Sequence, residues 1–272
     1  MPSTRFLFWN INRKPLAKAV ADLAEEQRAD VVVLAESEID PGTVLRELNT
    51  ARRGGFDYPL GFGKQVAIFT RFPREFLSPV ADSDHMSIRR LALPERPEIL
   101  VVALHLPSKL RQRDVSQAAA CHDWARRIAS AEDRLGHRRT VVLGDFNMNP
   151  FEPGLVMANG FNSVMSRQIA SRGTRTVDGQ EYPFFYNPMW GHFGDSRGHT
   201  AGSYFYDASE HVNYYWNVFD QVLVRPDLAG EFDPRQLKIV TSVGDRPLVA
   251  ANGRPDGTDF SDHLPIVFDL VF

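Results

Sequence analysis

The sequence predicts an α/β fold in which β-sheets and helices pack against one another in layers. Short apolar runs rich in Val, Ile and Phe recur along the chain, helical patterns lie between some of them, and no long linker divides the 272 residues. This length is enough for one large hydrophobic core or, at most, two small ones. Because sheets and helices must each bury an apolar face, we expect layered packing, although periodicity alone leaves the number of sheets open.

Seven of the apolar runs predict buried strands. Each run is short, is bounded by polar residues, and is rich in the β-branched and aromatic residues that favour strands. The predicted strands span residues 6–9, 31–35, 66–69, 99–104, 140–143, 218–224 and 264–272.

Three helices are predicted between these strands. The first begins near Pro15, which suits the first helical position, and continues to Leu23 with apolar residues at helical spacing. A shorter helix is predicted over residues 41–51, and the longest runs from about residue 109 to 135 and stops at Gly136. Cys121 falls on the buried side of the longest helix, so we expect a core residue rather than a reactive thiol.

The composition excludes several classes of protein. A single cysteine rules out a disulfide framework and a cysteine-based zinc site, and no CxxC or HExxH spacing occurs. A net charge of −3 argues against a polycation that coats nucleic acid, although a bound metal can supply positive charge locally. The sequence shows neither a signal-peptide pattern nor a membrane-spanning apolar run, so we expect no membrane anchor and a cytoplasmic location.

Carboxylate, amide and imidazole side chains lie at or directly beside the predicted strands. Side chains at strand ends are well placed to converge on one rim of a sheet. Carboxylates that meet repel one another unless a cation joins them, and oxygen ligands suit Mg²⁺ or Mn²⁺ better than zinc. The residues concerned are Asn10, Asn12, Glu36, His105, Asp145, Asn147, Asp220, Asp262 and His263.

Four short motifs beside these strands resemble the ordered motifs of the endonuclease/exonuclease/phosphatase, or DNase I-like, superfamily. They are Trp9-Asn10-Ile11-Asn12, Leu34-Ala35-Glu36, Gly144-Asp145-Phe146-Asn147 and Ser261-Asp262-His263. Each motif is weak alone, but together they follow the family's order across residues 9 to 263. The resemblance implies a four-layer sandwich with two central β-sheets covered by helices.

The resemblance also implies a metal site. Glu36 is similar to the family's principal metal ligand, and Asn10 to the amide that supports the metal and the phosphate. Asn12 holds a position that is often another polar residue of the metal site, and Asp262 approaches the metal from the opposite side. The implied cofactor is Mg²⁺ or Mn²⁺.

Catalytic roles follow from the same resemblance. Asp145 is similar to the residue that orients or deprotonates the attacking water, and Asn147 to the amide that donates to the phosphate. His263 resembles the histidine that faces the scissile phosphate, with Asp220 as its orienting carboxylate. Physically, a carboxylate or histidine can handle the water's proton, and an amide can stabilise developing charge.

His105 resembles the second histidine that DNase I-like members place after a strand. Residues Val102 to His105, followed by Pro107-Ser108, are closer to that branch than to the exonuclease III branch, where a tyrosine is usual. DNase I has an acidic partner for this histidine near the preceding strand. The comparable stretch here reads Gly63-Lys64-Gln65 and contains no acid.

These residues also have ordinary structural interpretations. Asp145 can simply occupy a strand-to-turn bend, Glu36 can be a solvated loop carboxylate, and His263 or His105 can be structural histidines. Asn12 can cap a loop. Lys109, which we predict to contact substrate phosphate, and Arg113 can instead belong to the solvated face of the long helix.

A segment rich in aromatic residues precedes Asp220. Residues 182–216 contain twelve aromatic side chains, and we predict an insertion at about residues 178–217 within a single domain spanning residues 1–272. Aromatic rings can stack on nucleobases, which makes Trp190, Tyr204 and Tyr206 candidate substrate contacts. The alternative is that these rings form a local core over the sheet edge.

The residues together predict a divalent-metal-dependent phosphodiesterase, with DNA or RNA as the leading substrate. A phosphatase or phospholipase acting on inositol phosphates, lipid head groups or other small phosphates is an alternative, because one fold hosts many substrates. A non-catalytic binding module is a further alternative, which loss of the metal-site residues would favour. Those residues are present in this chain.

Overall fold

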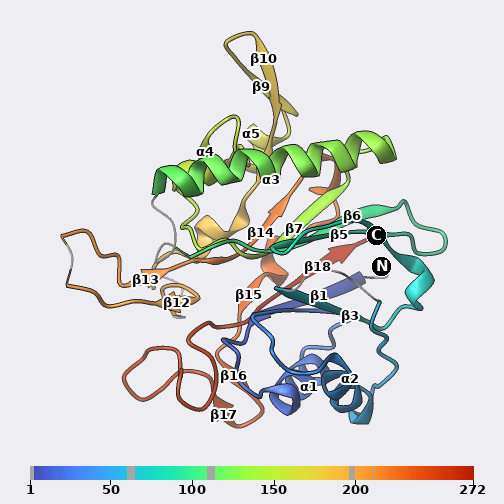
Figure 1. Ribbon diagram of the computed structural model, residues 1–272, viewed down its shortest axis with the longest axis vertical. Helices are drawn as coiled ribbons and strands as arrows, with labels where there is room; N and C mark the ends of the chain where they lie inside the picture. The colour runs from blue at the N-terminus through green and yellow to red at the C-terminus, as the bar shows by residue number, and fades with distance from the viewer. Residues whose placement is uncertain (1–2, 60–64, 109–113, 196–199, 210) are drawn as a thin grey trace.

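Two β-sheets lie at the centre of the molecule and helices cover their outer sides (Figure 1). The computed structural model describes residues 3–59, 65–108, 114–195, 200–209 and 211–272. This is the layered α/β sandwich that the sequence predicts. The single-domain organisation and the bounds of the insertion at about residues 178–217 stay predictions.

The first sheet has five strands in the order β15-β18-β1-β2-β3. β1 pairs with β2 in parallel and with β18 in antiparallel orientation, so the two ends of the sequence meet in this sheet. The strands are β1 (Ser3–Asn10), β2 (Val31–Ala35), β3 (Val66–Thr70), β15 (Lys238–Ile239) and β18 (Ile266–Val271).

The second sheet has seven strands in the order β4-β5-β6-β7-β14-β11-β8. In its centre β6 is parallel to β7, and β14 is antiparallel to β7. The strands are β4 (Leu77–Asp82), β5 (Met86–Leu91), β6 (Ile99–His105), β7 (Thr140–Asp145), β8 (Ser163–Val164), β11 (Phe185–Tyr186) and β14 (Asp220–Val224).

Three longer helices cover the two sheets. α1 (Ala17–Glu26) and α2 (Pro41–Thr50) lie on the outer side of the five-stranded sheet, and α3 (Asp114–Leu135) lies across the seven-stranded sheet (Figure 1). No helix in the described part of the chain is long and apolar enough to cross a membrane. Two one-turn helices, α4 (Pro153–Val156) and α5 (Arg167–Ala170), follow β7.

Short ribbons and 3₁₀ turns extend from this framework. The shorter elements are β9 (Thr174–Val177), β10 (Gln180–Pro183), β12 (Tyr204–Phe205), β13 (Trp216–Asn217), β16 (Ser242–Val243), β17 (Arg246–Pro247), η1 (Arg74–Phe76), η2 (Pro188–His192), η3 (Pro226–Leu228) and η4 (Pro234–Gln236). β9 pairs with β10, β12 with β13, and β16 with β17. The described residues of the aromatic segment contribute to β10, β11, η2, β12 and β13.

β6 shows why continuous apolar runs predicted buried strands. Val101 and Ala103 belong to the core between the sheets, whereas Leu100 and Val102 pack on the other face with Cys121 and its neighbours on α3. Because alternate side chains point to opposite faces and both faces are covered, every position is apolar.

Cys121 is a buried core residue, as predicted. Its side chain is buried beside Met148, at a distance of 4.0 Å between the two sulfur atoms. Burial, followed by the nearby charge of Glu152, raises the pKa of the Cys121 thiol to about 12. The thiol is therefore neutral at physiological pH and poorly reactive.

The β4–β5 hairpin is absent from the predicted strands. Its strands lie at the edge of the sheet and carry polar residues, so they form no apolar run. The guanidinium of Arg89 on β5 is buried because it donates to both oxygens of Asp82 on β4, at 2.7 and 3.1 Å. Only this tertiary pairing allows a charged residue to face inward.

Gly144 is required by the close approach of β6 and β7 just before Asp145, which the sequence predicts to be a site residue. Leu104 is its register partner on β6. A Cβ atom on Gly144 would lie 2.0 Å from the Leu104 carbonyl oxygen, a distance that no side chain can accommodate without moving the backbone.

We therefore expect Gly144→Ala to lower the free energy of unfolding by about 1–3 kcal/mol, the usual cost of forcing an extra carbon into a packed site. Chemical denaturation monitored by fluorescence measures this change. Gly230→Ala is the matched control, because a Cβ there meets no atom within 4 Å. Equal midpoints for the two variants would show that the β6–β7 approach imposes no such constraint.

Candidate active site

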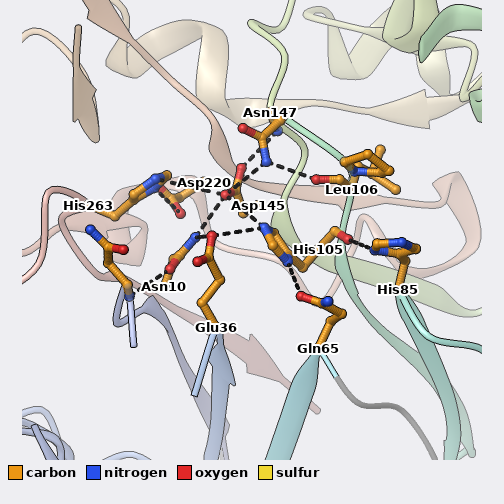
Figure 2. A network of polar contacts seen from close by, with 12 residues as sticks. Asn10, Glu36, Gln65, His85, His105, Leu106, Asp145, Asn147, Asp220 and His263 are labelled. Carbon is orange, nitrogen blue, oxygen red and sulfur yellow. Dashed lines mark hydrogen bonds and ion pairs between the residues drawn. The ribbon is translucent and has the colours of Figure 1, made fainter. Parts of the chain in front are cut away.

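The polar residues at the strand ends converge on one rim of the two sheets. Asn10 ends β1 and Glu36 follows β2, and the parallel pairing of these strands places Asn10 level with the last residue of β2. In the other sheet His105 ends β6 and Asp145 ends β7, while Asp220 begins β14. Asp145 is the register partner of both His105 and Asp220. Figure 2 shows the side chains of the two sheets pointing toward one another.

The carboxylate of Asp145 lies at the centre of this group. Its side chain is 1% exposed. The amide nitrogens of Asn10 and Asn147 donate to its Oδ2 at 2.9 and 3.2 Å. Nε2 of His105 and Nε2 of His263 lie 3.7 and 3.9 Å from the same oxygen. Two amide donors and two nearby imidazoles thus surround one buried carboxylate, which is what a charged group requires where water is excluded.

Glu36 is more open to solvent than Asp145, with 22% of its side chain exposed. Its Oε1 lies 3.2 Å from His105 Nε2 and 3.3 Å from Asn10 Nδ2. The hydrogen bond from His105, which outweighs the opposing effect of burial, lowers the pKa of Glu36 to about 2. The residue has a φ of 49°, a left-handed conformation that is uncommon for glutamate and is found at functional sites. Glu36 is therefore an ionised carboxylate that a ligand can reach.

His105 has a partner on each ring nitrogen. Its Nδ1 lies 3.1 Å from Oε1 of Gln65, and its Nε2 faces Glu36. Burial lowers the pKa of His105, but the nearby carboxylates of Glu36 and Asp145 outweigh burial and raise it. Gln65 thus takes the place of the acidic partner that the resemblance implies, a contact that the sequence did not reveal because glutamine is uncharged.

His263 and Asp220 form a buried pair on the other side of Asp145. Nδ1 of His263 lies 3.1 and 2.9 Å from the two carboxylate oxygens of Asp220. Burial opposes the charge of the imidazole, but the carboxylates of Asp220 and Asp145 outweigh it and raise the pKa of His263 to about 10. The histidine is therefore a cation at neutral pH, with its Nε2 directed toward Asp145.

Three residues to which the sequence assigned no role of their own hold His263 and its partner Asp220 in place. The hydroxyl of Ser261 donates to the Asn10 carbonyl at 2.6 Å and accepts from the His263 backbone N–H at 3.2 Å. The indole of Trp9 donates to the His263 carbonyl at 2.9 Å. The hydroxyl of Ser203 accepts from the Asp220 backbone N–H at 3.2 Å. Ser261 and Trp9 belong to the recognised motifs, whereas Ser203 has no signal of its own in the sequence.

Asn147 orients Asp145 in this structure. Its backbone N–H donates to Asp145 Oδ1 at 2.8 Å, and its side-chain amide donates to Asp145 Oδ2 and to the Leu106 carbonyl, the latter at 2.8 Å. Both hydrogens of the amide are thus in use. The predicted hydrogen bond from Asn147 to a phosphate requires the amide to give up one of these contacts.

Asn12 and Asp262 lie at the edge of the site. The backbone N–H of Asn12 donates to Asn10 Oδ1 at 3.0 Å, which closes a turn and leaves the Asn10 amide to join the two carboxylates. Asp262 is half-buried, and its Oδ1 is 3.5 Å from Ser261 Oγ. The metal-binding roles of Asn12 and Asp262 stay predictions.

The three aromatic candidates have different surroundings. The Tyr204 ring packs against His263, with 4.5 Å between ring centroids, so it lies at the site. Tyr206 is 42% exposed. Trp190 is half-buried against Phe151, with ring centroids 6.1 Å apart. Trp190 and Tyr204 are only partly exposed, because packing against Phe151 and His263 covers part of each ring. Their roles as substrate contacts stay predictions. Lys109 lies outside the described residues.

Two groups of possible metal ligands share Asp145. One contains Glu36 and His105, the other contains Asp220 and His263, and the ligand atoms of each group lie within 4.8 Å of one another. Both oxygens of Asp220 already face His263 and the side chain is fully buried. The group with the accessible Glu36 therefore fits a divalent cation better, and its carboxylate oxygens suit a hard ion.

Comparisons with known proteins give a family and a fold. The sequence matches the Endonuclease/Exonuclease/phosphatase family over residues 7–263, and a search of curated proteins found no match. The structure is similar to the endonuclease domain of TRAS1, a telomere-specific non-LTR retrotransposon, with a TM-score of 0.52, 15% identity and 99% of each chain covered.

Two further solved structures contain DNA. One is the 3′ phosphatase NExo from Neisseria bound to a product DNA hairpin, with a TM-score of 0.54, 15% identity, and 99% of this chain and 100% of that chain covered. The other is D. rerio TDP2 complexed with a single-strand DNA product, with a TM-score of 0.53, 15% identity and 100% of each chain covered.

At these identities the structural likeness shows the fold alone. The family match is independent of it and spans every residue of the rim from Asn10 to His263. The chain belongs to the endonuclease/exonuclease/phosphatase family.

Proposed function

We propose that this protein is a divalent-metal-dependent phosphodiesterase that hydrolyses nucleic acid. The observation that carries the proposal is the arrangement around Asp145, with the ionised Glu36 on one side and the cationic His263 on the other. A phosphodiester is an anion that repels nucleophiles, and this rim offers both a carboxylate for a cation and a fixed positive charge for the phosphate. Family membership supports the same reaction class.

Glu36 is the proposed principal ligand of a Mg²⁺ or Mn²⁺ ion. Asp145 lies within reach of the same cation, and Asn10 keeps the two carboxylates together by donating to both. Asn12 and Asp262 at the edge of the site are proposed to complete the surroundings of the ion. The ion, when bound, neutralises charge on the phosphate and on the leaving oxygen.

The remaining rim residues handle protons and charge. Asp145 is proposed to orient the attacking water and to accept its proton, which its central position allows. His263 faces the phosphate as a cation and is oriented by Asp220 through its other nitrogen. His105 and Asn147 are proposed to donate to phosphate oxygens once the substrate displaces their present contacts. Tyr204, Tyr206, Trp190 and Lys109 are proposed substrate contacts.

Nucleic acid is the proposed substrate because Tyr204 lies beside His263 and the exposed ring of Tyr206, two residues further on, can stack on a base. Two of the similar structures hold DNA, which is consistent with this choice. A cytoplasmic location is also proposed, on the basis of a chain with one buried cysteine.

The function is tested by a panel of single-stranded, double-stranded and abasic DNA, RNA, inositol phosphates, phospholipids and a chromogenic phosphodiester. We expect cleavage of a nucleic acid and of the chromogenic diester with Mg²⁺ or Mn²⁺. Glu36→Gln should lower kcat/KM by about a hundredfold or more, because a metal contributes several kcal/mol of charge stabilisation. The same variant should weaken Mn²⁺ binding in a calorimetric titration.

Glu38→Gln is the matched control for this substitution. Glu38 also approaches Arg13, at 3.4 Å, but its side chain is 71% exposed. The Glu38→Gln variant should keep the rate and the metal affinity of the unmodified protein. Release of phosphate from an inositol phosphate, or cleavage of a phospholipid, without cleavage of any nucleic acid would replace the proposed substrate with the alternative class.

The charge of His263 gives a second prediction. Its pKa of about 10 should be visible as a late histidine titration by NMR in the metal-free protein. Asp220→Asn should move this titration to lower pH by at least about one unit, because burial still opposes the charge after the carboxylate is removed.

The same shift predicts how stability depends on pH. An unfolded histidine titrates near 6.5, so the raised pKa of His263 stabilises the folded state fully below about pH 6.5. This contribution should decline as pH rises toward 10 and should be smaller in Asp220→Asn. Titration of His263 near 6.5 in the unmodified protein would contradict both expectations.

Tyr206 gives a third prediction. Its backbone N–H donates to the Tyr215 carbonyl, so the β12–β13 pairing continues through it, and alternation places it on the same face as Tyr204. Tyr206→Ala should raise KM for an oligonucleotide about fivefold or more, since stacking contributes about 1–3 kcal/mol per base. KM for the chromogenic diester should stay unchanged.

Tyr182→Ala is the control for the loss of a partly exposed tyrosine outside the β12–β13 ribbon. Tyr182 lies on the β9–β10 hairpin and bonds to Gln180 on the same hairpin. If Tyr182→Ala and Tyr206→Ala change the oligonucleotide KM equally, the β12–β13 ribbon is not a wall of the substrate cleft.

A further inference from the structure

A hollow of about 430 Å³ lies between α3 and the β4–β5 hairpin. Its volume falls within the range of about 300–1,000 Å³ that is usual for ligand sites. Four lining residues come from α3, and the hairpin closes the other side. The residues that matter are Arg126, Arg127, Ser130 and Arg134 from α3, facing Asp82 and Met86.

The hollow has an excess of positive charge in a chain whose net charge is −3. The charge of Asp82 is balanced by Arg89, which donates to it at 2.7 and 3.1 Å, and Ser87 donates to it at 2.7 Å. Arg126 has an acidic neighbour, Asp123, at 3.3 Å. Both side chains of that pair are largely exposed, and such pairs are weak and easily exchanged.

The three arginines can meet an anion together. Positions 127, 130 and 134 share one face of α3, and Arg126 flanks them. The guanidinium of Arg127 lies 5.8 Å from the centroid of the Trp124 ring, which fixes it beside the helix. Guanidinium groups bind phosphate oxygens with paired, planar hydrogen bonds.

A row of rings connects this hollow to the active-site rim. His85, in the turn between β4 and β5, donates from Nδ1 to the His105 carbonyl at 2.9 Å, and its ring lies 6.5 Å from the His105 ring (Figure 2). On its other side His85 meets the edge of Trp124 at 5.9 Å, and Trp124 contacts Arg127. Met86, the residue after His85, lines the hollow itself. Arg127 is therefore separated from His105 by only two side chains, Trp124 and His85.

We propose that this hollow, the α3 arginine site, binds backbone phosphates of the nucleic-acid substrate a few nucleotides from the bond that is cut. This inference rests on the proposed function. Phosphates follow one another at about 3.4 Å along each strand of a duplex, so a strand lying on the rim beside His105 reaches the arginines within a few nucleotides. The site provides the positive charge that the overall composition lacks.

The test compares oligonucleotide binding by the unmodified protein and by Arg126→Gln/Arg127→Gln/Arg134→Gln. Glutamine keeps the helix propensity of arginine, and all three side chains are exposed, so the fold should survive, as a thermal melt would verify. Binding of a labelled single-stranded 20-mer is measured in EDTA across a salt series. We expect the affinity for the oligonucleotide to fall about tenfold or more. The slope of log K against log salt should become shallower by about 2, since each of the three lost phosphate contacts removes about 0.7.

A second triple variant controls for net charge. Arg52→Gln/Arg172→Gln/Lys238→Gln removes the same charge from exposed positions on other elements. This variant should retain most of the affinity and the salt slope. Equal losses in the two variants, or unchanged binding in the α3 variant, would overturn the proposal.

Two further measurements separate the possible explanations. Hydrolysis of the chromogenic diester should be the same in the α3 variant and the unmodified protein, because the arginines do not touch the reacting phosphate. If no protein hydrolyses the diester, the proposed function fails while the binding measurement still decides the arginine site. If inorganic pyrophosphate binds the unmodified protein but not the α3 variant, and oligonucleotide affinity is equal in both, the site serves a free phosphate ligand and the proposal is wrong.

Discussion

A carboxylate that is 1% exposed, as Asp145 is, has lost nearly all of its water, and such burial costs several kcal/mol unless hydrogen-bond donors replace that water. Asn10 provides one donor from the five-stranded sheet, while Asn147 provides another from the loop after β7. The two sheets must therefore meet at one rim with β1 and β7 correctly placed. The need to stabilise one buried charge thus links the packing of the whole sandwich to the site.

The same buried charge organises the groups around it. Asp145 and Asp220 are register partners on β7 and β14, so His263, which bonds to Asp220, also comes within 3.9 Å of Asp145 and is held as a cation. Glu36 on the opposite sheet is held by His105 and Asn10. Carboxylates and imidazoles alternate across the rim, with His263 held as a cation, and a phosphate with its metal ion would enter an arrangement of charges that is already in place.

The proposed chemistry and the proposed substrate binding lie on different parts of the molecule. The proposed reacting groups lie at the ends of paired strands, whereas the proposed binding surfaces lie on the β12–β13 ribbon and along α3. Each surface touches the rim through an aromatic ring. Tyr204 packs against His263, and His85 packs beside His105. Affinity for a polymer can therefore change on these surfaces without disturbing the chemical step.

The layered α/β class, the seven buried strands and the motif residues could be predicted from the sequence. Apolar periodicity and the residues at strand ends are local properties, so a single sequence reveals them. It could not reveal the β4–β5 hairpin, whose buried Arg89 depends on Asp82, or the contact of Gln65 with His105, which are 40 residues apart in the sequence. Nothing in the sequence shows that the three arginines of α3 line a hollow, because its other side is formed by the hairpin. The packing of the sheets and helices sets which distant residues meet. Hydrogen bonds and charge clusters act over a few ångströms, so these contacts depend on the tertiary structure.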